Sequence, residues 1–198
     1  MDDVDWLAGL SPKARSHQRR EVLPWDTAFE VEVLRHGGRI PSASELEHLH
    51  GLYRNVELRG LEANSFELPP TILADMLAHP CWELVLLCLR PEAGGPAGGA
   101  PVAFGAHFIG RDYYAPMVLG LDYAYVRSHH SYRQALRQAF LRERAHGARR
   151  ILLGMGAALE KRRFGARPHS RLAYVQASDH YSQQVLAALE AETLGAAA

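Results

Sequence analysis

The stretch from Asp112 to Gly165 constrains the fold of this chain more than any other segment, because its apolar pattern changes period along its length. Residues 112–119 are apolar and aromatic, as in a strand. From Tyr132 to Phe140 the apolar residues recur at helical spacing. Residues 151–153 form a short apolar run that is typical of a buried strand. A strand, a crossover helix and a second strand predict one right-handed unit with two parallel strands.

Three residues in this unit, a proline and two glycines, are expected to interrupt or end its elements. Pro116 lies inside the first strand, where it has no amide donor, so it predicts a bulge, a splay or a sheet edge. Gly120 is expected to allow a sharp turn, and Gly147 marks the end of the helix. The loop that enters the helix is expected to consist of Arg127, Ser128, His129, His130 and Ser131. Its backbone N–H groups would lie at the positive end of the helix dipole, which suits a phosphate.

The other elements complete a mixed sheet. Strands are predicted at 29–33, 82–89, 102–109 and 169–176, and helices at 11–23, from 42–44 to about 60, 71–78 and 179–194. Two overlapping capping-box patterns, Ser42-x-x-Glu45 and Ser44-x-x-Glu47, mark the start of the second helix. The resulting order predicts an α/β (α+β) fold with a mostly antiparallel sheet, a splayed central strand and helices on both faces.

The length of 198 residues predicts one domain over residues 1–198, with a frayed tail at 195–198. The formal net charge is zero, which excludes a general attraction to nucleic acid or to a membrane surface. No apolar run approaches the roughly 20 residues of a membrane span. The start of the chain lacks the pattern of a signal peptide, and Cys81 and Cys88 are expected to be reduced, so we expect a cytoplasmic protein. No histidine pair has a zinc-site spacing, so no metal is predicted.

Three segments together resemble the GNAT superfamily of N-acyltransferases, and more closely its FemAB-like branch of acetyltransferase domains. They read SPKARSHQRREVLP at 11–24, GLDYAYV at 120–126 with HGARRILLG at 146–154, and EKRRFGA at 160–166. The resemblance extends over roughly residues 11–190. It implies a GNAT-like sheet and an N-acyltransferase that moves an acyl or aminoacyl group from a carrier thioester or ester to the amine of a small acceptor.

Two departures from the family pattern leave alternatives open. Acyl-CoA users in the superfamily carry a glycine-containing loop before the crossover helix, whereas residues 127–131 contain no glycine. The donor is therefore acyl-CoA, an acyl carrier protein or an aminoacyl-tRNA. FemAB-like proteins often have two lobes and this chain has the length of one, which is consistent with a homodimer. A catalytically silent lobe that binds a ligand or partner is the alternative function.

The resemblance also implies positions for the chemistry. A backbone N–H near Val118, Leu119 and Gly120 would stabilise the oxyanion that forms on the carbonyl. Glu160 could accept the proton of the amine or bind a cationic acceptor, and Lys161 could bind a carboxylate, a phosphate or the oxyanion. A surface ion pair in a charged loop would explain Glu160 and Lys161 equally well.

Other polar residues complete the expected site. Asp122 could orient the amine or only form a turn, and Tyr125 and Tyr114 could protonate the leaving group or be buried with satisfied hydroxyls. The donor is expected to contact residues at the start of the helix, namely Ser128, His129, His130, Ser131 and Arg133. The acceptor is expected near Glu62, Asn64, Phe66 and Tyr114.

Overall fold

The computed structural model describes residues 3–60, 67–170, 179–180, 183–185 and 187. It divides the chain into two compact units, residues 1–167 and residues 168–198. All the helices and strands discussed below belong to the first unit. In the second unit, the described residues 183–185 are helical and fall within the predicted helix 179–194. The predicted strand 169–176 and the tail 195–198 lie mainly or wholly outside the described residues.

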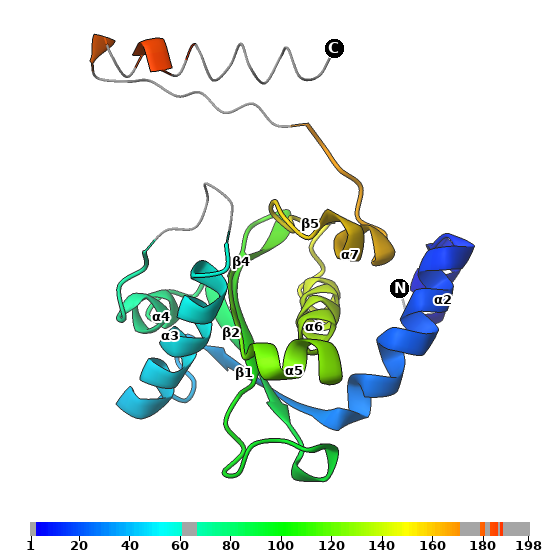
Figure 1. The fold of residues 1–198 in the computed structure, drawn as a ribbon, viewed down its shortest axis with the longest axis horizontal. Helices are drawn as coiled ribbons and strands as arrows, with labels where there is room; N and C mark the ends of the chain where they lie inside the picture. Colours follow the sequence, from blue (N-terminus) through cyan, green and yellow to red (C-terminus); the bar gives the residue numbers. More distant parts are fainter. Residues whose placement is uncertain (1–2, 61–66, 171–178, 181–182, 186, 188–198) are drawn as a thin grey trace. The chain divides into compact units, whose positions relative to one another are not determined.

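The first unit alternates helices and strands in an order close to the predicted one (Figure 1). Its elements are α1 (Asp3–Gly9), α2 (Pro12–Glu21), η1 (Leu23–Ala28), β1 (Phe29–Arg35), α3 (Ala43–Glu57), α4 (Ile72–Leu77), β2 (Trp82–Leu89), η2 (Pro91–Ala93), β3 (Ala103–Ile109), β4 (Tyr113–Leu121), α5 (Tyr123–Ser128), α6 (Ser131–Ala145), β5 (Arg150–Ile151) and α7 (Ala158–Arg163).

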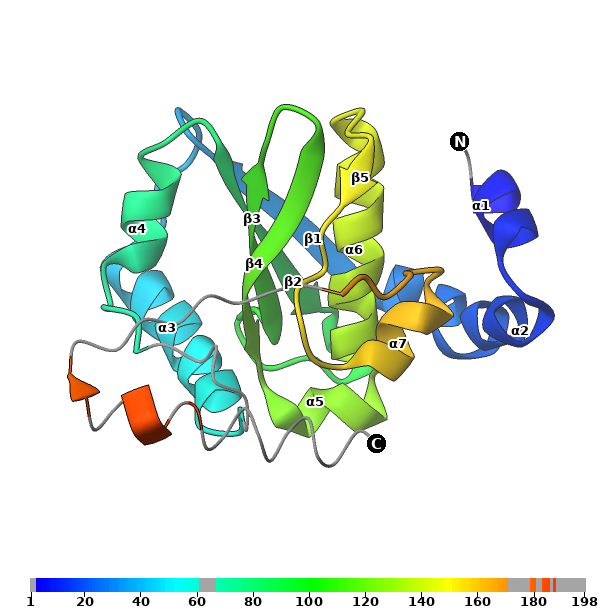
Figure 2. The same cartoon turned by 90° about the horizontal axis from the view of Figure 1, so that it is seen from above.

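The five strands form one sheet in the order β1-β2-β3-β4-β5. The first four strands are antiparallel neighbours, and β4 pairs with β5 in parallel. Helices α3 and α4 lie on one side of the sheet, and α5 and α6 lie on the other (Figures 1 and 2). The predicted mixed, mostly antiparallel sheet with helices on both faces is therefore confirmed.

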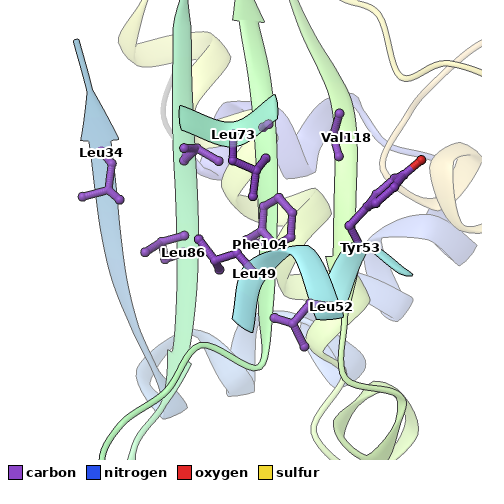
Figure 3. Close-up of a cluster of buried hydrophobic side chains, with 10 residues drawn as sticks. Leu34, Leu49, Leu52, Tyr53, Leu73, Leu86, Phe104 and Val118 are labelled. Carbon is purple, nitrogen blue, oxygen red and sulfur yellow. The ribbon is translucent and has the colours of Figure 1, made fainter. Parts of the chain in front are cut away.

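The core on the α3 side consists mainly of aliphatic side chains that surround Phe104 of β3 (Figure 3). Helix α3 begins with the predicted capping box, since the Ser42 side chain accepts from the Glu45 N–H at 3.2 Å and the Ser42 N–H donates to the Glu45 carboxylate at 2.8 Å. The helix then packs Leu49 and Leu52 against the sheet. Burying these two leucines contributes about 2 kcal/mol each.

On the other side of the sheet, α6 lies between the strands and the N-terminal helices. Arg137 of α6 is 3% exposed and forms ion pairs with Asp3 and with Asp26, the latter at 3.2 Å. Gln134 donates to the Val22 carbonyl at 2.7 Å. These contacts fix residues 3–28 on the outer surface of α6, which brings the end of α2 close to the start of α6.

Several local predictions were wrong. The expected loop 127–131 is shorter than predicted: His129 and His130 lie between the helices, whereas Arg127 and Ser128 belong to α5, which the Asp122 side chain caps by accepting from the Ala124 N–H at 2.9 Å, and Ser131 begins α6. Gly120 does not turn the chain: it lies in β4, where a Cβ atom would be 2.1 Å from the Phe104 ring. Strand β5 pairs over two residues only, and Glu160 lies on α7 rather than in a loop.

No helix among the described residues has the length and apolar character that a membrane span requires.

Candidate functional site

The centre of the candidate site is a β-bulge in β4. Ala106 pairs with Val118 whereas the next residue of β3, His107, pairs with Pro116, so Met117 is the extra residue. Its side chain is 64% exposed. A bulge leaves the extra residue outside the regular ladder and turns local backbone groups away from the neighbouring strand. The irregularity that Pro116 predicted is therefore present.

Strands β4 and β5 part just beside this bulge. Their pairing is limited to Tyr113 with Arg150 and Tyr114 with Ile151. The Leu152 N–H then donates to the Tyr114 carbonyl at 2.9 Å, and beyond this point the described residues show no further β4–β5 pair. Figure 2 shows the chain leaving β5 towards α7. The second half of β4, from Ala115 onward, therefore has one edge without a partner strand in the part of the chain that the structure describes.

The start of α6 carries basic side chains that internal carboxylates already contact. His130 precedes the helix with φ of 55°, a left-handed conformation that usually favours glycine. Arg133 lies 3.2 Å from Glu21 and 3.2 Å from Glu160 and also contacts the His130 ring. Burial and the charge of Arg133 lower the pKa of His130, so its ring is neutral at pH 7.

Glu160 is the acidic centre of the contact between α2, α6 and α7. Its carboxylate pairs with Arg133 at 3.2 Å, with Arg163, and with the ring of His17 at 3.4 Å. Burial acts to raise the pKa of Glu160, but the hydrogen bond and charge of Arg133 outweigh it and hold this pKa below its usual value. Glu160 is thus an ionised member of an ion-pair cluster, which makes it a weak base.

Lys161 supports the loop between β5 and α7. Its ammonium group donates to the Met155 carbonyl at 2.6 Å and to the Gly154 carbonyl at 3.3 Å. Gly154 and Gly156 both have positive φ, so this loop makes a tight path after the end of β5. The contacts place Lys161 at the exit of β5 and give it a role in loop geometry.

Most of the residues that were expected to contact the donor have contacts within the protein. His129 is bound to the β2–β3 connection through the Ala93 carbonyl at 3.0 Å, and the Ser128 hydroxyl donates to the Ala124 carbonyl at 2.7 Å. Tyr125 packs against His129 with ring centroids 5.4 Å apart. Ser131 is fully buried, and its hydroxyl has no hydrogen-bond partner among the described residues. The expected acceptor contacts Glu62, Asn64 and Phe66 lie outside the described residues.

A buried polar network, which sequence reasoning missed, adjoins the bulge. Tyr114 is fully buried, and its hydroxyl donates to Glu83 of β2 at 2.7 Å and also contacts His107. Glu83 is itself fully buried and accepts two hydrogen bonds of 2.9 Å from Arg142 of α6. Burial and the neighbouring carboxylate raise the pKa of Tyr114. The sequence signal was a single glutamate inside an otherwise apolar strand, which requires a partner when buried.

The residues at the start of α6 fit a phosphate only in part. The helix is 15 residues long, and its first N–H groups and Arg133 would favour an anion. Glu21 and Glu160 oppose it, because both carboxylates are already within 3.2 Å of Arg133. A phosphate-bearing donor could therefore bind here only by weakening one of these ion pairs. As for metals, the described residues contain no group of three or more His, Cys, Asp or Glu side chains that could hold an ion.

The fold matches solved structures at low sequence identity, among them acetyltransferases. The aminoglycoside acetyltransferase meta-AAC0020, from an uncultured soil metagenomic sample, is 14% identical over 77% of this chain and 99% of that chain, with a TM-score of 0.52. A tetramutant of the BH1408 protein from Bacillus halodurans is 12% identical over 75% of this chain and 99% of that chain, also with a TM-score of 0.52.

A third structure, AAC(6')-Iy in complex with a CoA-linked bisubstrate analogue, is 12% identical over 76% of this chain and 99% of that chain, with a TM-score of 0.50. No family model and no curated protein matches the sequence. At these identities the likeness establishes the fold, which is that of the GNAT acetyltransferases.

Proposed function

We propose that this chain is an N-acyltransferase that moves an acyl group from a carrier to the amine of a small acceptor. The observation that carries the proposal is the bulge at Met117 beside the point where β4 and β5 part. An extended thioester arm can add to an unpaired strand edge through main-chain hydrogen bonds, as extended peptides do. The edge of β4 that has no partner strand among the described residues offers such a position, and the bulge supplies backbone groups for the reacting carbonyl.

The reaction requires an amine to attack the carbonyl carbon of the donor. The C–N bond forms, the C–S or C–O bond to the carrier breaks, and the amine loses a proton. The carbonyl oxygen gains negative charge on the way and needs donors in place. We assign this role to the backbone N–H groups at the bulge, those of Met117, Val118 and Leu119. The Gly120 N–H is less suitable for it, because alternate residues of β4 face β3 and Gly120 lies two residues before Asp122, whose N–H donates to the Val102 carbonyl of the neighbouring strand segment at 2.8 Å.

The donor that we favour is acyl-CoA, with acyl carrier protein and aminoacyl-tRNA as alternatives. AAC(6')-Iy, which shares the fold, was solved in complex with CoA. In this chain Arg133 and the first N–H groups of α6 would hold a phosphate of the donor, while His129 and His130 would line its path. Because two carboxylates contact Arg133, we expect weaker donor binding than at a site without them.

The acceptor would be a small primary amine. The acetyltransferase meta-AAC0020 was also solved in complex with sisomicin. We propose that Glu62, Asn64 and Phe66 contribute to the acceptor side. Glu160 would act through its charge on a cationic acceptor, since its pKa is too low for an efficient base. Tyr125 and Asp122 remain candidates for contacts with the amine or the leaving group.

The test is carrier release in steady state. Acetyl-CoA and longer acyl-CoAs, an acyl carrier protein and an aminoacyl-tRNA would each be incubated with a panel of primary amines, and free thiol or free tRNA would be quantified together with the acylated product. Amine-dependent release above the uncatalysed rate is expected for at least one donor. If none of the donors gives amine-dependent release at saturating amine, the proposal is contradicted.

A catalytically silent binding lobe is the second candidate function. It is favoured by the observation that the side chains of Glu160, Lys161 and Tyr114 all have internal partners. A donor or donor analogue would bind to such a lobe and raise its melting temperature, but the lobe would not convert the donor to product. Binding without turnover would therefore distinguish the two candidates.

A further inference from the structure

A row of polar side chains crosses three strands next to the β4 bulge. Glu83 of β2 is paired in register with His107 of β3, and His107 is paired with Pro116, the residue before the bulge. Tyr114 closes the row on β4 by donating to Glu83 at 2.7 Å and contacting the Nδ1 atom of His107. All three side chains of the row are buried, at 3% exposure or less.

The imidazole of His107 reaches both sides of the bulge. On one side its Nδ1 atom meets the hydroxyl of Tyr114, which precedes Pro116 by two residues. On the other side its Nε2 atom lies over Gly105, where an added Cβ atom would be 2.1 Å away. Gly105 pairs with Leu119, which follows the bulge. The ring therefore bridges the register before Met117 and the register after it.

The protonation states of the row are fixed by its surroundings. Glu83 is fully buried and faces three basic side chains: Arg35 at 2.8 Å, Arg142 at 2.9 Å and His146 at 3.1 Å. It is therefore a carboxylate, and it accepts the hydrogen bond that the Tyr114 hydroxyl donates. The oxygen of Tyr114 then accepts from His107, whose ring is neutral and carries its proton on Nδ1. Each donor in the row has one acceptor, so the arrangement has a single hydrogen-bonding direction.

We propose that Glu83, Tyr114 and His107 are positioning residues that hold the β4 bulge in the geometry the acyl carbonyl requires. This inference rests on the proposed function, since the direction of the N–H groups at the bulge matters only if an oxyanion forms there. The row does not touch the donor. It sets the backbone to which the donor binds, and a misplacement of about 1 Å at such a point costs on the order of a hundredfold in rate.

The test compares paired variants of the full chain. Tyr114→Phe removes the hydroxyl and keeps the ring that stacks on His146 with centroids 5.5 Å apart. His107→Leu removes the donor to Tyr114, whereas His107→Asn places an amide N–H near the position of Nδ1. We expect kcat to fall about tenfold to a hundredfold in Tyr114→Phe and His107→Leu, with the KM of the donor unchanged. His107→Asn is expected to recover most of the loss.

Amide hydrogen exchange of Met117 and Val118 gives the second readout, and it does not depend on turnover. Faster exchange at these two residues in Tyr114→Phe, with Val85 and Leu87 of the neighbouring strand unchanged, is expected. An unchanged kcat in variants with lowered melting temperature would reduce the row to a structural role and overturn the inference. If the wild-type chain releases no carrier with any donor, the proposed function fails separately, and unchanged exchange at Met117 and Val118 would then overturn the positioning role.

Discussion

Arg142 of α6 donates two hydrogen bonds of 2.9 Å to the carboxylate of Glu83 on β2, although the two residues are 59 positions apart in the sequence. The carboxylate is fully buried, whereas the Arg142 side chain is 17% exposed. A buried carboxylate is stable only while its basic partners remain, because ionised groups are costly to remove from water. This pair therefore links the helix to the strands at the polar network beside the bulge.

Replacement of Arg142 by methionine is expected to lower the free energy of unfolding by about 3 kcal/mol, because it leaves Glu83 with Arg35 and His146 as its basic partners. The matched control is Arg39→Met. Arg39 also contacts two carboxylates, those of Glu32 and Glu45, but at the surface, so its loss should stay within about 1 kcal/mol. Urea unfolding of the three proteins measures both values. Equal losses would contradict the importance assigned to burial.

The stability of the protein is expected to fall from pH 7 to pH 5, in part because of His107. Burial lowers the pKa of His107 from 6.5 to about 3, so in this range the unfolded chain binds a proton that the folded chain does not. Stability therefore rises with pH between about 3 and 6.5, and the contribution of His107 at pH 5 is a loss of about 2 kcal/mol.

The variant His107→Asn isolates this effect. His17 and His130 also have lowered pKa values and act in the same direction, but both are present in the wild type and in the variant. The difference in slope between the two unfolding curves should therefore report His107 alone. Parallel curves from pH 7 to pH 5 would show that His107 is protonated in the folded chain.

Gly120→Ala is expected to destabilise the protein by about 1–3 kcal/mol through overpacking. The new Cβ atom would be 2.1 Å from the Phe104 ring and 2.9 Å from Leu52. The control is Gly51→Ala in the middle of α3, where no atom lies within 4 Å, and where alanine should stabilise the helix by about 0.5–1 kcal/mol. Thermal unfolding compares the two. Equal stability of both variants would show that β4 and β3 can move apart at this point.

Glu21→Gln is expected to lower the KM of an acyl-CoA donor about twofold to fivefold, since it removes a charge that competes for Arg133 through a surface-type ion pair. Glu21 is the more exposed of the two carboxylates at this position, so its replacement should not affect folding strongly. Glu30→Gln on the edge strand is the control for a change in net charge. A KM that is unchanged, or that rises equally in both variants, would place the phosphate elsewhere.

Local patterns predicted most of the scaffold. The capping box at Ser42 and the left-handed Gly147 depend on residues close in sequence, and both are present as predicted. The apolar run from Trp82 to Leu89 forms β2 over those same residues. The proline in β4 correctly indicated an irregular strand, although its neighbour Met117 forms the bulge.

The candidate site was harder to predict because its geometry depends on distant partners. Glu160 was expected in an open loop, but its contacts come from Arg133, 27 residues away, and from His17 on α2. Gly120 resembled a turn residue, and only the opposite ring of Phe104 explains the absence of a side chain. The short helix α5 had a local signal in Asp122, which was interpreted as a turn former although it caps the helix.

The most direct test of donor binding at the opening between β4 and β5 is a titration of the ¹⁵N-labelled full chain with an unreactive acyl-CoA analogue. We predict that the amide signals of Met117 and Val118 shift together with those of the first turn of α6, while the signals of β1 stay in place. Saturable shifts that leave Met117 and Val118 unchanged would contradict this location for the thioester.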